Sequence, residues 1–156
     1  MRGVAIVSPV RTAVGNFGGS LRGISAADLA SMVIKETLER TQLDPAKVDD
    51  VILGHGYPSG ENPAIGRLAL LKAGLPIEVP GYQLDRRCSS GLQAILNACM
   101  MVQTENADVV IAGGAVSEVR PQCVESTVAT GCVMVAAEGA GELGVCKSAP
   151  KIRVRP

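Results

Sequence analysis

Aromatic residues are nearly absent from this sequence of 156 residues, which contains no Trp, one Phe and two Tyr. A hydrophobic core must therefore be built from aliphatic side chains. Apolar residues make up 47% and charged residues 19%, which is typical of a globular protein and excludes a disordered one. The length suits one ordinary domain with a single core.

Net charge is also absent, because 15 Lys and Arg residues balance 15 Asp and Glu residues. Sequence-independent binding to nucleic acid requires a basic surface, so we expect no nucleic-acid partner. No apolar run approaches the roughly 20 residues that cross a bilayer, and Pro9 interrupts the apolar start of the chain. We therefore expect neither a membrane partner nor a signal peptide.

Cysteine pairs of the CxxC type are missing, and the five Cys residues show no metal-type spacing. We predict no metal site and a cytoplasmic protein with reduced thiols. The single His, His55, follows a predicted strand and is interpreted as a solvated or structural loop residue. Three Cys residues fall in the C-terminal part of the chain, where no role is assigned to them: Cys123, Cys132 and Cys146.

Short apolar runs alternate with amphipathic segments along the first 114 residues. Three such runs predict strands at 4–7, 51–53 and 109–112, and 82–84 is a further strand candidate between the last two. Continuous apolar runs of this length are typical of strands buried on both faces of a parallel sheet. The resulting order, β-α-β-α-β-α-β, predicts an α/β fold with right-handed crossovers and a mostly parallel sheet.

Helix signals fill the first two gaps between these strands. Ser25 is predicted to start the first helix, with Asp28 three residues later as its capping-box partner. Asn62 is predicted to cap the second helix, with Pro63 at its first position and Gly74 just past its end.

The third helix is predicted from about residue 89 to residue 103. Leu92, Ile95, Leu96 and Cys99 share one face, and Cys99 is assigned to core packing. The helix itself carries apolar residues on nearly all sides, so we expect it to be buried.

The segment 115–156 differs in character from the rest. From about Val116 neither the period of a strand nor that of a helix persists, and Asp, His and aromatic residues are missing. We predict a poorly patterned tail that is disordered or that results from a reading-frame shift. A genuine short protein with a divergent C-terminus is the alternative.

Cys88 lies where the third predicted strand meets the third helix, and ligands of such sheets bind at the carboxyl ends of the strands. The N–H groups and dipole of a helix start favour an anion, and Arg86 and Arg87 add positive charge nearby. A thiolate favoured in this way attacks acyl carbonyls, and the same N–H groups can stabilise the oxyanion. On spacing alone, a small buried hydrophobe remains the alternative.

Four motifs, in order along residues 1–114, resemble the thiolase family. They are the Arg-Thr entry with its Gly-Phe-Gly-Gly, the second strand–helix unit, the Cys-Ser-Ser-Gly-Leu-Gln run and the strand with two glycines: 4–19, 51–76, 88–95 and 110–114. The resemblance implies a thiolase-like N-terminal domain over 1–114. It also implies that Cys88 is S-acylated by an acyl-CoA, and that the acyl group passes to coenzyme A or to a second acyl-CoA in a Claisen condensation.

The resemblance further implies acyl-CoA and coenzyme A as substrates, with no additional cofactor, and a possible homo-oligomer formed through the N-terminal domain. Two positions depart from the family motif, because Asp85 replaces an Asn and Ser89 stands where Gly is frequent. Both are interpreted as subfamily variation.

Beyond Gly114 the match to the family fails. Residues 115–118 do not reproduce its Glu-Ser-Met-Ser segment, and neither its Gly-His-Pro motif nor its second Cys motif is present. We therefore predict a truncated thiolase with impaired acyl transfer. A non-catalytic fragment that keeps only the fold and the subunit contacts is the alternative, and a decarboxylating condensing enzyme of the same fold is a third possibility.

Overall fold

The computed structural model describes residues 2–16, 19–56, 58, 60, 62–116, 129–137 and 152–153. Strands and helices alternate along the first part of the chain, as predicted, and the α/β class is confirmed. The elements are β1 (Val4–Arg11), α1 (Ala26–Thr41), the 3-10 turn η1 (Pro45–Lys47), β2 (Asp50–Gly54), α2 (Ile65–Ala73), β3 (Gly81–Leu84), the 3-10 turn η2 (Arg87–Ser89), α3 (Ser90–Gln103), β4 (Val109–Val116), β5 (Ala129–Ala137) and β6 (Ile152–Arg153).

The described strands form one sheet in the order β3-β2-β4-β5-β1-β6. Strand β2 pairs in parallel with β3 and β4, as expected for strands joined by crossover helices. The other pairings, β4 with β5, β5 with β1 and β1 with β6, are antiparallel. The sheet is therefore mixed rather than mostly parallel, because β5 runs against both of its neighbours.

Strand β5 lies within the segment for which the sequence indicated no regular structure. It occupies the middle of the sheet, between β4 and β1, and Met134, Val135 and Ala136 are fully buried. Because both of its faces are covered there, no alternation of polar and apolar residues marks it. Gly131 and several Ala residues further weaken its strand signal. The prediction of an unstructured tail was wrong for these residues.

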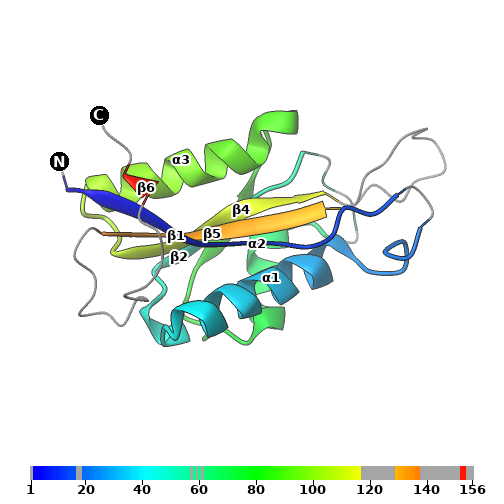
Figure 1. Cartoon of the computed structure of the whole chain (residues 1–156), viewed down its shortest axis with the longest axis horizontal. Helices are drawn as coiled ribbons and strands as arrows, with labels where there is room; N and C mark the ends of the chain where they lie inside the picture. The colour runs from blue at the N-terminus through cyan, green and yellow to red at the C-terminus, as the bar shows by residue number, and fades with distance from the viewer. Residues whose placement is uncertain are drawn as a thin grey trace.

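Helices cover both faces of the sheet, with α1 and α2 on one side and α3 on the other (Figure 1). Successive residues of β2 illustrate the two cores, because Leu53 packs with α1 and α2 whereas Ile52 packs with α3. The first core includes Ile34 and Leu70, and the second includes Ala94, Ala98 and Val102 of α3. Alternation along each strand therefore decides which layer a side chain enters.

The first helix begins as predicted. The Ser25 hydroxyl accepts a hydrogen bond from the Asp28 N–H (3.1 Å) and donates one to the Asp28 carboxylate (2.6 Å). At the end of α2, Gly74 adopts the left-handed conformation that a helix C-cap favours, with φ of 88°.

The predicted start of α2 was wrong. The helix begins at Ile65, after Ala64, and Asn62 makes no cap. The Ile65 N–H instead donates to the Gln83 side-chain oxygen of β3 (3.0 Å). A tertiary contact thus replaces the local cap that the sequence suggested.

The prediction that α3 is buried all round was also wrong. Its sheet-facing side carries small residues, whereas Leu92, Leu96 and Met100 are 63%, 47% and 52% exposed. These three residues, four apart along the helix, form one outward stripe. None of the described helices is long and apolar enough to cross a membrane.

Candidate active site

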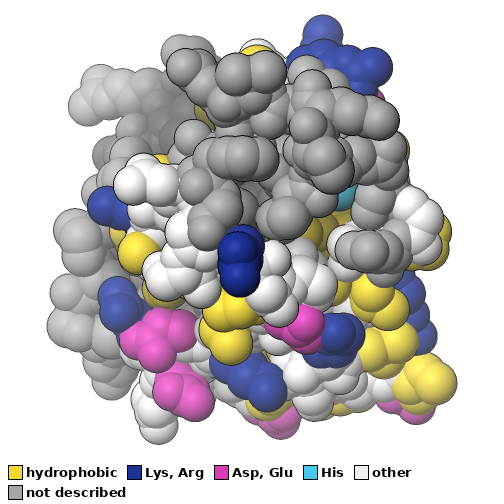
Figure 2. Space-filling model, turned by 90° about the vertical axis from the view of Figure 1, so that its right-hand side faces the viewer, with side chains coloured by type: hydrophobic (Ala, Val, Ile, Leu, Met, Phe, Trp, Pro, Cys, Tyr) yellow, Lys and Arg dark blue, Asp and Glu magenta, His cyan; other side chains and the backbone are white. Residues whose placement is uncertain are grey.

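Cys88 lies in η2, between the end of β3 and the start of α3, and its side chain is exposed. The strands β2, β3 and β4 run in parallel, so their carboxyl ends meet at this end of the molecule. Figure 2 shows this end, where basic and acidic side chains lie beside one another among hydrophobic ones. The sequence-predicted nucleophile is therefore accessible at the edge where ligands of such sheets bind.

Two glycines bring the start of α3 into direct contact with the sheet. A Cβ atom on Gly54 of β2 would lie 2.2 Å from the Ser90 carbonyl carbon and 2.5 Å from the Gly91 nitrogen. A Cβ on Gly114 of β4 would lie 3.1 Å from the Gly91 Cα. The missing side chains of Gly54 and Gly114 therefore set how closely the Cys88 turn approaches the sheet.

Ser90 ties this turn together. Its buried hydroxyl accepts a hydrogen bond from the Arg86 N–H (2.8 Å) and donates one to the Arg87 carbonyl (2.7 Å). The Ser89 N–H also donates to the Arg86 carbonyl (3.1 Å). These bonds close a tight turn around Cys88 and fix the direction in which α3 leaves it.

The positive charges expected beside Cys88 are both engaged. The Arg86 guanidinium donates to the Gln93 side-chain oxygen (2.6 Å), and Gln93 in turn donates to Asn97 (2.8 Å). The Arg87 guanidinium pairs with the Asp85 carboxylate at 2.8 Å. A carboxylate therefore offsets the charge of Arg87, whereas Arg86, bound to a neutral amide, keeps its positive charge beside the thiol.

His55 does not partner Cys88. Its side chain is only 3% exposed, and its Nδ1 atom lies 2.7 Å from the Ala115 carbonyl oxygen. Because a carbonyl oxygen only accepts, Nδ1 carries the proton. A Cβ on Gly54 would face α3, and the His55 N–H continues the hydrogen bonding of β2 to β3. Because successive residues of a strand point to opposite faces, the His55 side chain lies on the side of the sheet away from α3. The structural interpretation of His55 agrees with this geometry, and the solvated one does not.

The other described thiols are buried. Cys99 packs in the core beneath α3, as predicted, and burial raises the pKa of its thiol. Cys132 of β5 is 3% exposed, lies 3.2 Å from the Thr37 hydroxyl, and has its pKa raised to about 11 by burial. Cys123 and Cys146 lie outside the described residues. Within the described part of the chain, no group of His, Cys, Asp and Glu side chains could hold a metal ion.

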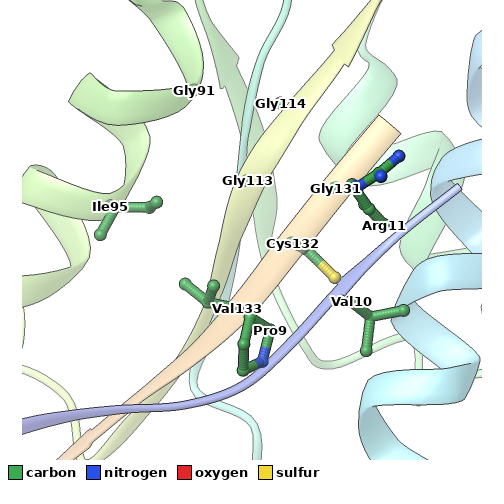
Figure 3. Close-up of a pocket in the computed structure, with 10 residues that line it drawn as sticks. All are labelled: Pro9, Val10, Arg11, Gly91, Ile95, Gly113, Gly114, Gly131, Cys132 and Val133. Carbon is green, nitrogen blue, oxygen red and sulfur yellow. The ribbon is translucent and has the colours of Figure 1, made fainter. Parts of the chain in front are cut away.

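A cavity of about 450 Å³ opens between α3 and the antiparallel part of the sheet. Its lining comes from β1, β4, β5 and α3, and includes Gly91 and Ile95 but, among the described residues, not Cys88. Figure 3 shows Val133 on the α3 side of β5, whereas the Cys132 sulfur points to the other side. The hollow thus reaches the first turn of α3 from the side, and its lining is mostly apolar.

Comparison with known proteins adds independent observations. Residues 4–145 match the family model described as "Thiolase, N-terminal domain", so the family match continues beyond Gly114, where the motifs alone indicated that it ends. The chain is 47% identical over 116 residues to an acetyl-CoA acetyltransferase of Pseudomonas aeruginosa, covering 73% of this chain and 29% of the relative. It is 46% identical over 110 residues to a steroid 3-ketoacyl-CoA thiolase of Mycobacterium tuberculosis, covering 70% of this chain and 27% of the relative.

A solved structure is similar as well. The crystal structure of the Bacillus anthracis acetyl-CoA acetyltransferase matches with a TM-score of 0.73 at 41% identity. The match covers 75% of this chain and 30% of that chain. The present chain therefore spans less than a third of the length of the relatives that it matches.

Proposed function

This chain belongs to the thiolase family, and from that premise we propose that Cys88 is the acyl acceptor of an acyltransferase acting between coenzyme A thioesters. The observation that carries the proposal is the position of Cys88. It is exposed, at the carboxyl end of the parallel strands, on a turn that leads directly into α3. The other two described thiols are buried and face packed cores.

The proposed reaction has two acyl-transfer steps. The Cys88 thiolate attacks the thioester carbonyl of an acyl-CoA, the carbon–sulfur bond to coenzyme A breaks, and coenzyme A leaves as a thiolate that takes up a proton. In the second step, another coenzyme A thiolate, or the carbanion of a second acyl-CoA, attacks the S-acyl Cys88 and releases it. We expect free backbone N–H groups at the start of α3 to stabilise the oxyanion in either step, other than those of Ser89 and Ser90, which donate to Arg86 and Arg87.

His55 does not transfer protons in this reaction, because its Nδ1 donates to the Ala115 carbonyl and its side chain points away from α3. General acid–base assistance is typically worth about 10²–10⁴-fold. We therefore expect acylation of Cys88 in this chain to be slow, and faster at a pH at which more of the thiol is ionised.

The test is to incubate the chain with acetyl-CoA and to follow released coenzyme A together with the mass of the Cys88 peptide. We expect one acetyl group on Cys88 and an equal amount of coenzyme A. Cys88→Ser is the control for the nucleophile, and Cys99→Ser controls for removal of a thiol elsewhere. Acetylation that persists in Cys88→Ser, or its absence at every pH tested, contradicts the proposal.

We place this activity in the cytoplasm, because a reducing compartment protects a thiolate nucleophile from oxidation. Cys88, Cys99 and Cys132 are free thiols, which supports that placement. The substrates are coenzyme A and its thioesters, and the proposed steps use no further cofactor.

A second candidate function is subunit contact without catalysis. Two features favour it: β3 lies at an edge of the sheet, and the stripe of Leu92, Leu96 and Met100 on α3 is exposed. Unpaired strand edges and contiguous apolar surface both promote association. We expect self-association in size-exclusion chromatography with light scattering, and a monodisperse monomer would contradict this candidate.

A further inference from the structure

Asp85 and Arg87 are joined by two hydrogen bonds within the Cys88 turn. The Asp85 carboxylate accepts one from the Arg87 backbone N–H (2.8 Å) and another from the Arg87 guanidinium (2.8 Å). The same guanidinium nitrogen also donates to the Gly56 carbonyl beyond the end of β2 (2.5 Å). The Arg87 side chain therefore links Asp85, at the start of the turn, to the segment that follows β2.

The backbone at Arg87 is in the left-handed region, with φ of 53°. For a residue with a long side chain this conformation costs about 1–2 kcal/mol, and it persists only where the surroundings enforce it. The Asp85 carboxylate fixes the Arg87 N–H, and Gly56 leaves room behind it, since a Cβ there would lie 3.1 Å from the Arg87 carbonyl oxygen. The strained residue immediately precedes Cys88, so its conformation decides where the thiol points.

The same contacts decide the charge around the thiol. Asp85 lies three residues before Cys88 on one turn, and an unpaired carboxylate there would oppose the negative charge of a thiolate. Arg87 offsets that carboxylate. Arg86 also lies beside the turn and keeps its positive charge, because its partner Gln93 is neutral, whereas His55 points to the opposite side of the sheet.

We propose that Asp85 and Arg87 act as a pair of positioning residues for Cys88. The Asp85 side chain holds the left-handed turn that presents the thiol, because it accepts from the Arg87 backbone N–H, and the Arg87 guanidinium neutralises the carboxylate that this turn requires. The inference rests on the proposed role of Cys88. It also accounts for Asp85 at a position where the family motif has Asn, because here a charged acceptor comes with its own cation.

The experiment measures the rate at which iodoacetamide alkylates Cys88 across pH, by peptide mass spectrometry. It compares the wild type with Arg87→Leu, Asp85→Asn and the double variant Asp85→Asn/Arg87→Leu. The Asp85→Asn substitution keeps an acceptor for the Arg87 N–H but removes the charge. We expect Arg87→Leu to slow alkylation near neutral pH about three- to tenfold and to move the pH profile upward. The double variant should return to within about twofold of the wild type.

A merely structural role for Arg87 would change the rate by the same factor at every pH and would not be reversed by Asp85→Asn. Either result overturns the proposal, as does an unchanged profile in Arg87→Leu. If circular dichroism shows that Arg87→Leu does not fold, Asp85→Asn alone decides the question. This variant should move the pH profile of Cys88 alkylation to lower pH, and an unmoved profile overturns the proposed pair. Iodoacetamide needs only a reactive thiol, so failure of acetyl-CoA to acylate Cys88 would count against the proposed function and not against this pair.

Discussion

The two faces of the sheet are built in different ways. On one face α1 and α2 bury large aliphatic side chains, such as Ile34 and Leu70, with no exposed area. On the other face α3 meets the sheet through Ala94 and Ala98, and a cavity of about 450 Å³ remains beside it. Large side chains fill the described core of the first face, whereas a cavity remains open on the second.

This difference separates stability from chemistry. The α1–α2 face gains free energy from the apolar area that it removes from water. The α3 face instead uses Gly54 and Gly114 to bring a helix start close to two strand ends, where Cys88 is presented. A close contact between backbones buries less apolar side-chain area, but it fixes the position of α3 on the sheet. Substitutions on the two faces should therefore have different effects on stability and on the reactivity of Cys88.

Thiol reactivity should show the largest contrast between the faces. We expect native-state alkylation of Cys88 to exceed that of Cys132 by about a thousandfold, because Cys132 reacts only after the sheet opens at a cost of several kcal/mol. Peptide mass spectrometry after timed iodoacetamide pulses measures both rates in one sample. In urea the two rates should converge, and similar rates in native buffer would show that β5 is not protected.

The core of the α1–α2 face should dominate global stability. Ile34→Ala removes fully buried methyl groups and should lower the free energy of unfolding by about 3 kcal/mol. Leu96→Ala, on the exposed stripe of α3, is the matched control and should change it by less than about 1 kcal/mol. Urea titration followed by circular dichroism measures both. Equal losses would mean that the stripe is covered in solution, which light scattering would then detect as an oligomer.

The order of elements in residues 4–114 could be predicted because every strand there except β3 contains a short apolar run and each gap carries helix signals. Strand β5 could not, since a central strand with small residues shows no alternation. The position of Cys88 followed from the same strand–helix order. The outward stripe of α3 was missed because an all-round apolar helix does not reveal which side its neighbours cover, and here the small residues, not the large ones, face the sheet.

The hydrogen-bond partners of the site also could not be predicted from the sequence. Ala115 accepts from His55 across 60 positions, and Gly56 accepts from Arg87 across 31. Both contacts depend on which strands are neighbours in the sheet. The cap of α2 by Gln83 has the same origin, because a side chain from β3 is placed at the helix start only once β3 pairs with β2.

The glycine contacts beneath α3 should be sensitive to a single methyl group. In Gly54→Ala the new Cβ would overlap the backbone of Ser90 and Gly91, so we expect a loss of about 2 kcal/mol in unfolding free energy and slower alkylation of Cys88. Gly23→Ala is the matched control, since nothing lies within 4 Å of its Cβ, and it should stay within about 0.5 kcal/mol. An unchanged Cys88 rate in Gly54→Ala would show that the contact between β2 and α3 does not position the thiol.

Alkaline pH should weaken the molecule through the buried thiol of β5, by the smallest of these effects. Burial raises the pKa of Cys132 to about 11 from an ordinary value of 9.0, so above pH 9 the unfolded chain releases a proton that the folded chain retains. The unfolded state then binds fewer protons, and stability falls with rising pH until about pH 11. Between pH 9 and pH 10 the loss due to Cys132 should be about 1 kcal/mol. Urea titrations at both pH values measure it, and Cys132→Ala, which lacks the thiol, should show a correspondingly shallower decline. Equal declines in the two proteins would mean that Cys132 ionises in the folded state as readily as in the unfolded one. Water would then reach the core around β5 more easily than its packing indicates.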